Sequence, residues 1–317
     1  MTWFLGILVL ILVSPILATG FLVALGRLRV PPHGKFVKAG GGKLHYRDVG
    51  QGQAVVLIHG AGAQMRSLTA TLESRLKDRF RVISLDRPGM GYSEPQKADD
   101  LSLDRQAAIL LEALDLIGVE APILVGHSLG GALSLTMARR APDRIRGLAL
   151  IAPLTRHLDT LPGVFRPLVI PDRRRRTVVS YTLAAPTSVL RGPQVLRRIF
   201  APEDPPDWFA TDCGGLLAAR PRMFRSMSEE ATRGTEELKE VQEGYPGMGM
   251  PVAILYGRED AILDAAEQGE RTATEIPGAT CDVVPGGHML PVTQPDLTAD
   301  WIRRQVDRIV EITNQPT

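Results

Sequence analysis

The sequence of 317 residues has little cysteine and little net charge, the features that mark disulfide-rich, metal-binding and nucleic-acid-binding proteins. It has two cysteines, Cys213 and Cys281, which form neither a disulfide framework nor a metal-ligand spacing and leave the redox compartment undecided. The formal net charge is only +2, so the balance of charge does not suggest nucleic-acid binding. No repeat of the solenoid or propeller kind is found. The length suits one large domain, or a core with an insertion, that buries a sizeable apolar interior.

Charged side chains are also absent from residues 1–26, which are rich in Leu, Ile, Val and Phe. Such a run is long enough to cross a hydrocarbon core of roughly 30 Å as a helix, so we predict a membrane span over Trp3–Leu25. A cleaved signal peptide is the disfavoured alternative, because there is no basic n-region and the apolar run exceeds the usual length of about 7 to 15 residues. Arg27 and Arg29 follow directly, and the positive-inside rule then places the rest of the chain in the cytoplasm.

Strand-like apolar runs alternate with helical stretches through most of the chain. Strands are predicted over residues 43–47, 54–58, 81–85, 123–125, 148–152, 252–256 and 280–284, and helices over 65–77, 103–117, 131–140, 265–276 and 297–312. This alternation argues for an α/β fold, a mostly parallel sheet covered by helices on both faces. From about residue 153 to residue 248, between two predicted strands, this alternation of strands and helices stops. Several short helices are expected there instead. We therefore predict an anchor with its basic flank at 1–30, a core at 31–153 and 248–317, and an inserted helical cap at 154–247.

A nucleophile motif stands between one predicted strand and the helix after it. The segment Gly126-His127-Ser128-Leu129-Gly130 has the pattern Gly-x-Ser-x-Gly. A strand that passes into a helix through one residue needs a turn so sharp that positions two before and two after the serine have no room for a Cβ. The Ser128 hydroxyl would project above the strand end, beside the free N–H groups of a helix N-terminus. That position suits attack on a carbonyl carbon.

Serine is a weak nucleophile near neutral pH and needs a base and an acid that orients the base. His288 lies in a glycine-rich loop near the C-terminus, and its type of side chain titrates near the working pH. Asp260 follows the strand 252–256, where an orienting acid belongs, and Asp264 in the same loop is its rival. The order Ser128, Asp260, His288 forms a candidate catalytic triad.

The oxyanion formed by such an attack needs hydrogen-bond donors. The segment His59-Gly60-Ala61-Gly62 follows the strand 54–58, and its small residues let backbone N–H groups converge. We predict the N–H groups of Ala61 and Leu129 as the oxyanion hole. His59 and His127 are expected to be structural rather than proton carriers, and Glu259 and Asp282 are expected to be surface charges.

These motifs together resemble the α/β-hydrolase fold family, over roughly residues 36 to 310. The run from Asp86 to Ser93 also resembles the loop that follows an early strand in that family. The resemblance implies Ser128 as nucleophile, Asp260 as acid, His288 as base and the turn at His59-Gly60 as oxyanion loop. A serine nucleophile is unlike the dehalogenase and epoxide-hydrolase branches, which place an aspartate there.

The expected function is a membrane-anchored serine hydrolase that cleaves carboxylic esters, apolar or lipid-like because the anchor brings the cap near the bilayer. The expected partners are a small-molecule ester and a membrane, without nucleic acid, and no metal or organic cofactor is implied. Three alternatives stay open: a carbon–carbon bond hydrolase, an amidase on the same triad, and a non-catalytic ligand-binding protein on the same fold. Chain length of the acyl group and oligomeric state are left open.

Two features of the cap have competing interpretations. The basic cluster Asp172–Arg176 is read as a solvated helix start in preference to a contact with anionic headgroups, which would be worth around 1 kcal/mol per basic residue. The apolar pairs Trp208-Phe209 and Met223-Phe224 fit packing within the cap better than a lipid access path.

Overall fold

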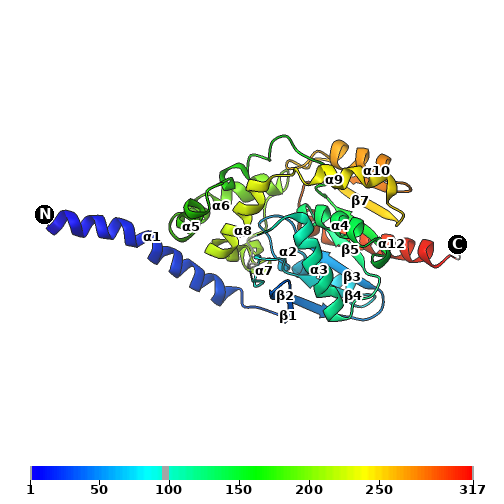
Figure 1. Ribbon diagram of the computed structural model, residues 1–317, viewed down its shortest axis with the longest axis horizontal. Helices are drawn as coiled ribbons and strands as arrows, with labels where there is room; N and C mark the ends of the chain where they lie inside the picture. The colour runs from blue at the N-terminus through cyan, green and yellow to red at the C-terminus, as the bar shows by residue number, and fades with distance from the viewer. Residues whose placement is uncertain (1, 95–99, 316–317) are drawn as a thin grey trace.

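The computed structural model describes residues 2–94 and 100–315, and in the N-terminal helix it describes the side chains of Trp3 and of Val13 onwards. In this part of the chain one sheet of eight strands forms the centre of the molecule (Figure 1). The strand order is β1-β2-β4-β3-β5-β6-β7-β8; β1 and β2 are antiparallel to their neighbours and the other neighbouring strands are parallel. The strands are β1 (Lys35–Ala39), β2 (Gly42–Val49), β3 (Ala54–Ile58), β4 (Arg81–Leu85), β5 (Ile123–Gly126), β6 (Gly147–Ile151), β7 (Val252–Gly257) and β8 (Thr280–Val284).

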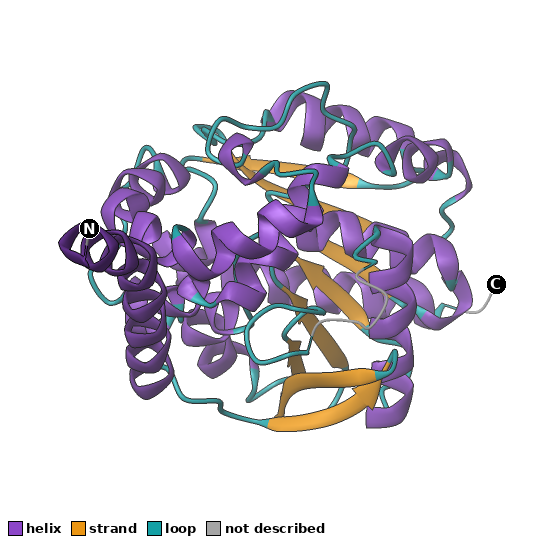
Figure 2. Cartoon of the chain, turned by 60° about the vertical axis from the view of Figure 1, so that its left-hand side comes forward, coloured by secondary structure: helices purple, strands orange, loops and turns teal. Residues whose placement is uncertain are grey.

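Alternate residues of the central strands feed two separate apolar clusters, one on each face of the sheet. Val56 and Ile58 belong to the cluster that includes residues of α3 (Leu103–Ile117) and α4 (Leu129–Arg140). Val55 and Leu57 belong to the cluster that includes residues of α2 (Arg66–Leu76) and α12 (Pro295–Asn314). Figure 2 shows helices on both sides of the strands. Because a strand points successive side chains to opposite faces, these strands are apolar throughout.

The predicted α/β architecture is therefore confirmed, and the seven predicted strands are all present. Three details differ. The strand β1 carries exposed and buried residues without a strong apolar run, and the sequence did not reveal it. The helix α4 begins at Leu129, two residues before the predicted start. The predicted helix over 265–276 contains a π-helical segment (Ala266–Arg271) before α10 (Thr272–Glu275).

Between β6 and β7 the chain forms helices joined by loops, and within this described stretch no strand occurs. The division into cap and core at 154 and 247 stays a prediction; the name cap is used here for residues 154–247. In the cap, Met223 is buried, and Phe209 packs edge-on against Phe200 at 4.9 Å between ring centroids. Its helices are η2 (Arg166–Leu168), α5 (Arg173–Thr182), α6 (Ala184–Phe200), α7 (Phe209–Asp212), η3 (Gly215–Ala219), α8 (Pro221–Arg233), α9 (Leu238–Glu243) and η4 (Tyr245–Gly247).

The N-terminal segment forms one helix, α1 (Thr2–Arg29), which extends away from the body at its N-terminal end (Figure 1). Its C-terminal half contacts α5, α6 and η3 of the cap, and Val30 is buried beside Leu217 and Met223. Among the residues that the structure describes, no helix combines the length and the apolar character needed to cross a membrane. The transmembrane part of the fold prediction is thus not supported, although the side chains of residues 4–12 in the predicted span lie outside the description.

Candidate active site

Ser128 lies on a strained turn between β5 and α4. Its φ of 55° and ψ of −123° place a non-glycine residue in a conformation that L-residues rarely adopt, which costs on the order of 1–3 kcal/mol. A Cβ at Gly126 would collide with the carbonyl oxygen of Gly130, and a Cβ at Gly130 would collide with that of Ile58. The glycines on both sides of the serine are therefore required by the close approach of backbone, as the sequence predicts.

His288 and Asp260 form a buried pair after the ends of β8 and β7. The His288 Nδ1 atom lies 2.7 Å from Asp260 Oδ2, and the two side chains are 5% and 1% exposed. The other carboxylate oxygen of Asp260 accepts the backbone N–H groups of Ile262, at 2.8 Å, and Leu263, at 3.0 Å. With Nδ1–H donating to the carboxylate, the neutral ring keeps Nε2 as an acceptor, which is the state that a general base needs.

Asp264, the rival acid, has a different role in the structure. Its side chain is exposed, and Oδ1 accepts the backbone N–H of Glu267 at 3.0 Å. This is the contact of a residue that caps a helix turn. The structure thus brings Asp260, and not Asp264, to His288.

Two further histidines lie close to these residues and are held neutral. His127 Nε2 lies 3.0 Å from the carbonyl oxygen of His288, and His59 Nε2 accepts the backbone N–H of Arg87 at 3.1 Å. Burial lowers the pKa of each of these two histidines to about 3. Both are therefore uncharged hydrogen-bonding groups near neutral pH, in agreement with the structural roles expected for them.

The predicted oxyanion residues flank the nucleophile. Ala61 and Leu129 line the same pocket as Ser128. A Cβ at Gly60 would lie 2.9 Å from the Ser128 Cβ and 3.4 Å from its Oγ, so only a glycine leaves this approach open. Leu129 is the first residue of α4, where N–H groups have no partner within the helix. The placement suits the expected role, which stays a prediction.

Arg87 holds the predicted oxyanion loop at His59-Gly60, and no sequence pattern singles this residue out beyond its place in the run from Asp86 to Ser93. Its side chain is fully buried; Nε donates to the His59 carbonyl oxygen at 3.1 Å and Nη2 to that of Gly60 at 3.0 Å. The guanidinium also pairs with Glu230 of the cap helix α8. Gln106 accepts from Arg87 at 2.8 Å and donates to Glu230 at 3.1 Å, so the buried charges are balanced. The cap is thereby tied to the loop beside Ser128.

Two carboxylates hold the loop that precedes His288. Glu259 is exposed, as expected, and its carboxylate accepts the backbone N–H of Gly286 at 2.6 Å. Glu203 of the cap accepts the N–H of Gly287 at 3.2 Å. Asp282 lies outside this loop; it is exposed, as expected, and accepts the N–H of the Trp301 indole at 2.7 Å. These contacts join residues far apart in the chain, and no local sequence pattern predicts them.

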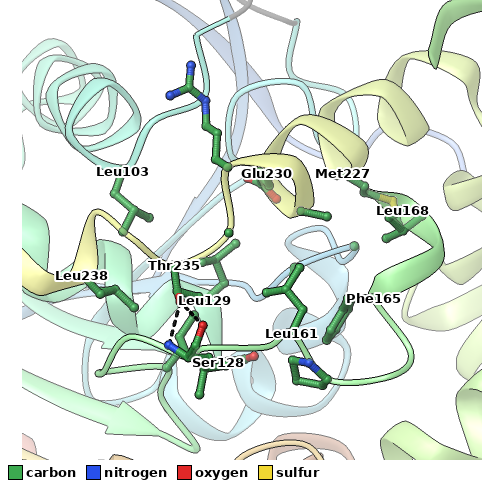
Figure 3. Close-up of a pocket in the computed structure, with 18 of the residues that line it drawn as sticks. Leu103, Ser128, Leu129, Leu161, Phe165, Leu168, Met227, Glu230, Thr235 and Leu238 are labelled. Atoms are coloured by element: carbon green, nitrogen blue, oxygen red, sulfur yellow. Dashed lines mark hydrogen bonds between the residues drawn. The ribbon is translucent and has the colours of Figure 1, made fainter. Parts of the chain in front are cut away.

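Above Ser128 lies a pocket between core and cap with about 860 Å³ of empty volume, its open mouth included. Figure 3 shows the side chains of Leu161, Phe165 and Leu168 arranged around it, with Ser128 at its base. Most of the lining is apolar, and it comes from both parts of the chain: Ala61, Leu101, Leu103, Leu129, Leu154, Leu158, Leu161, Pro162, Phe165, Leu168, Met227, Leu238, Ile262 and Leu263.

Three of the described lining residues carry charge. Among the described lining residues the cation is Arg233, and carboxylates of Glu230 and Glu237 lie there too. Arg233 pairs with Asp100 at 3.0 Å, Glu229 at 3.3 Å and Glu237 at 3.5 Å. Its charge is already compensated, which makes the cavity a poor receptor for an anion and a good one for an apolar chain. The described residues contain no cluster of three or more metal-ligating side chains.

The family model described as alpha/beta hydrolase fold matches residues 53–295, and this chain belongs to the α/β-hydrolase fold family. It is 27% identical over 257 residues to the dihydrolipoyllysine-residue acetyltransferase component of an acetoin cleaving system from Cupriavidus necator, covering 80% of this chain and 64% of that protein. It is 35% identical over 238 residues to 2-hydroxy-6-oxo-2,4-heptadienoate hydrolase from Pseudomonas putida, covering 73% of this chain and 80% of that one.

A solved structure of a thermophilic esterase from Thermogutta terrifontis matches with a TM-score of 0.72 and 24% identity, covering 87% of this chain and 99% of the esterase. At that identity the likeness shows the fold alone. The family, together with hydrolases among the relatives, supports a hydrolase.

Proposed function

We propose that this chain is a serine hydrolase that cleaves carboxylic esters with an apolar acyl group, through Ser128, His288 and Asp260. Two observations together carry the proposal: the buried His288–Asp260 pair, which is linked to the neighbour of Ser128 through the contact of His127 with the His288 carbonyl oxygen, and the apolar pocket whose base is Ser128. A hydroxyl on a strained turn, a histidine fixed in one tautomer and a small-residue loop are the parts that acyl transfer requires.

In the proposed reaction, Ser128 Oγ attacks the acyl carbon while His288 Nε2 takes its proton. The negative charge that develops on the carbonyl oxygen is stabilised by the N–H groups of Ala61 and Leu129. When the carbon–oxygen bond breaks, the imidazolium returns the proton to the departing alcohol, leaving an ester on Ser128. Water then attacks that ester with His288 as base again, and the acid is released. Asp260 stabilises the imidazolium in both halves.

The lining of the pocket supports an apolar acyl chain. Each methylene group moved from water into such a site contributes about 0.8 kcal/mol, and side chains such as Leu161, Phe165 and Leu168 are placed to receive them. An alkyl ester brings no charge that would need a partner.

A carbon–carbon bond hydrolase is the second candidate, because the Pseudomonas putida relative of that kind is 35% identical over 238 residues. The name of that protein gives its substrate as a carboxylate. Within the described lining of this pocket the cation Arg233 is engaged by three carboxylates, which counts against an anionic substrate here. We therefore place the ester first.

Membrane attachment through the N-terminal helix forms part of the same proposal. It is supported by the absence of charged side chains from residues 1–26 and by the basic residues Arg27 and Arg29 that follow. The positive flank puts the catalytic domain on the cytoplasmic side. Retention of the full chain in the membrane pellet after alkaline carbonate washing is expected; release into the supernatant would contradict attachment.

The test of the chemistry is a panel of p-nitrophenyl esters with acyl chains of about two to sixteen carbons, compared with 2-hydroxy-6-oxo-2,4-heptadienoate. We expect kcat/KM to rise with chain length until the pocket is filled, by about threefold to fourfold per methylene where each is fully buried. Ser128→Ala is the matched control for uncatalysed and contaminant hydrolysis. A higher kcat/KM on the heptadienoate than on every ester would favour the second candidate.

A further inference from the structure

The cap helices α5 and α6 carry charge of one sign. Residues 173–200 hold seven arginines and no aspartate or glutamate: Arg173, Arg174, Arg175, Arg176, Arg191, Arg197 and Arg198. Arg176 is buried and pairs with Glu229, whereas the side chains of the other six are exposed. Asp172, just before this stretch, is the N-cap residue of α5, and its side chain accepts the backbone N–H of Arg175 at 2.7 Å. The two helices therefore present a strongly positive surface.

The same two helices expose large apolar side chains, which charged helices at a protein surface usually keep covered. Val178 is 61% exposed and Leu190 is 77% exposed, and Tyr181, Leu183 and Val189 are exposed as well. In α5, Arg174, Val178 and Tyr181 follow one another at spacings of four and three, which places them on one side of the helix. Leu183, the N-cap residue of α6, is followed at intervals of seven by Leu190 and Arg197, which also places these three residues on one side of the helix.

The helix α1 extends this surface. It packs on both α5 and α6 through its C-terminal half, and the Thr19 hydroxyl lies 3.4 Å from the carbonyl oxygen of Thr182 in α5. Figures 1 and 2 both show α1 beside these cap helices. On α1, Leu17, Phe21 and Leu28 are exposed, and the first acidic residue of the whole sequence is Asp48. Exposed apolar side chains thus continue from the cap onto α1, where the sequence up to Asp48 adds no acidic residue.

We propose that this outer face of α5 and α6, the docking face, rests on the surface of an anionic phospholipid bilayer. Exposed aliphatic and aromatic side chains beside arginines suit the boundary between acyl chains and headgroups, where apolar atoms enter the lipid and guanidinium groups bind phosphate. Each arginine near the surface adds to the attraction to anionic lipid. A second copy of the chain fits this face less well, because the contact would bring arginines against arginines.

The docking face also adjoins the proposed active site. The helix α8 contacts α5 on one side, and its Met227 and Glu230 line the pocket on the other. A bilayer against α5 and α6 would lie one helix away from the apolar cavity above Ser128. The inference rests on the proposed membrane attachment, and it makes the bilayer the source of the apolar ester.

The experiment uses the full chain co-floated with vesicles and an environment-sensitive dye on a single introduced cysteine. Leu190→Cys places the dye on the docking face; the matched control is Leu116→Cys, which is 58% exposed near the end of α3. The native thiols should not compete, because burial raises the pKa of both Cys213 and Cys281 to about 12. The first residue of α3, Leu103, donates its backbone N–H to Glu237 of the cap. Leu116 lies about 20 Å further along the same helix, away from this contact with the cap.

With vesicles that contain about 30% phosphatidylglycerol, we expect the dye at position 190 to shift to shorter wavelength and to lose most of its quenching by aqueous iodide, by about threefold or more relative to position 116. Replacing Arg174 and Arg197 by glutamate should restore the quenching at 190. Equal quenching at 190 and 116 on co-floated protein would overturn the docking face while leaving attachment intact. Protection at 190 without lipid, in concentrated protein, would overturn it in favour of contact between copies.

Ester turnover, measured on the same samples, separates this inference from the proposed chemistry. Protection at position 190 without turnover of any ester would leave the docking face standing and remove the esterase. Turnover without protection would do the reverse.

Discussion

The Nδ1 atom of His288 lies 2.7 Å from Oδ2 of Asp260, while the other oxygen of the same carboxylate is held by the N–H groups of Ile262 and Leu263. Because both carboxylate oxygens of Asp260 are engaged, its side chain has one orientation, and it holds the imidazole ring of His288 in one orientation as well. A histidine held in this way has one nitrogen committed and the other free to exchange a proton. The proposed catalysis depends on this arrangement.

The choice of acid gives the first prediction. Asp260→Asn replaces the carboxylate that accepts from His288 by an amide, which favours the wrong tautomer, and kcat should fall on the order of 10⁴-fold. Asp264→Asn, at the exposed residue that caps the next helix turn, should change kcat by less than about twofold. Steady-state kinetics on one ester measures both. A larger loss at Asp264 would show that the acid is assigned wrongly.

The strained backbone at Ser128 gives a prediction that separates function from stability. Ser128→Ala should remove turnover, by on the order of 10⁵-fold or more, and should leave the free energy of unfolding within about 0.5 kcal/mol. Ser128→Gly should also be inactive but more stable than the alanine variant by about 1 kcal/mol, because glycine tolerates a φ of 55°. Urea unfolding of the three proteins provides the comparison. A glycine variant less stable than the alanine variant would argue against strain at this residue.

The ion pair between Arg87 and Glu230 ties the cap to the predicted oxyanion loop. Glu230→Gln should leave a buried guanidinium without its counter-charge and lower the free energy of unfolding by about 3 kcal/mol. We expect kcat to fall with KM less affected, because the loop at His59-Gly60 that Arg87 holds lies beside the reacting atoms. The matched control is Glu237→Gln, which changes another carboxylate of the same pocket. Glu237 pairs with Arg233, and both side chains of that pair are partly exposed. Equal effects of the two substitutions on kcat would contradict the prediction that the contact between Arg87 and Glu230 supports turnover.

Two buried histidines should make the fold sensitive to acid. His59 and His127 titrate at about 3 when folded, against an ordinary value of 6.5, because burial disfavours the charged ring. Between those two values the unfolded chain binds more protons, so the free energy of unfolding should fall as pH falls, by up to about 1.4 kcal/mol per pH unit for each histidine. The contribution is fully present above pH 6.5 and is lost towards pH 3.

Urea titrations at several pH values between 7.5 and 5 measure this slope. His127→Asn keeps a donor for the His288 carbonyl oxygen and should reduce the slope by the share of one histidine. His33→Asn, at an exposed histidine, controls for removing an imidazole from the chain. An unchanged slope in His127→Asn would contradict the burial argument.

Much of the fold could be predicted from the sequence, because its strands are apolar on both faces and are separated by amphipathic helices. The residues of the elbow were predictable for the same local reason: a sharp turn from strand to helix demands glycine at 126 and 130. The strand β1 gave no such signal, since its residues are mostly exposed and its place at the sheet edge depends on pairing with β2.

The polar contacts that support the site could not be predicted. Arg87 meets Glu230 across 143 positions of sequence, and Glu203 meets Gly287 across 84. Such pairs form only when the cap closes on the core, and neither residue type nor spacing indicates the partner. The packing of α1 on the cap could likewise not be predicted, because the uncharged, apolar residues 1–26 indicate a membrane span and no partner within the chain.

The central claim is that Ser128 is the nucleophile of acyl transfer, and the covalent intermediate tests it most directly. Protein acid-quenched during turnover of p-nitrophenyl octanoate should carry an octanoyl group on the peptide that contains Ser128, detected by peptide mass mapping, and the pre-steady-state release of p-nitrophenolate should show a burst. The Ser128→Ala protein should show neither. Full turnover with no acyl group on Ser128, or an acyl group that persists in Ser128→Ala, would contradict the account.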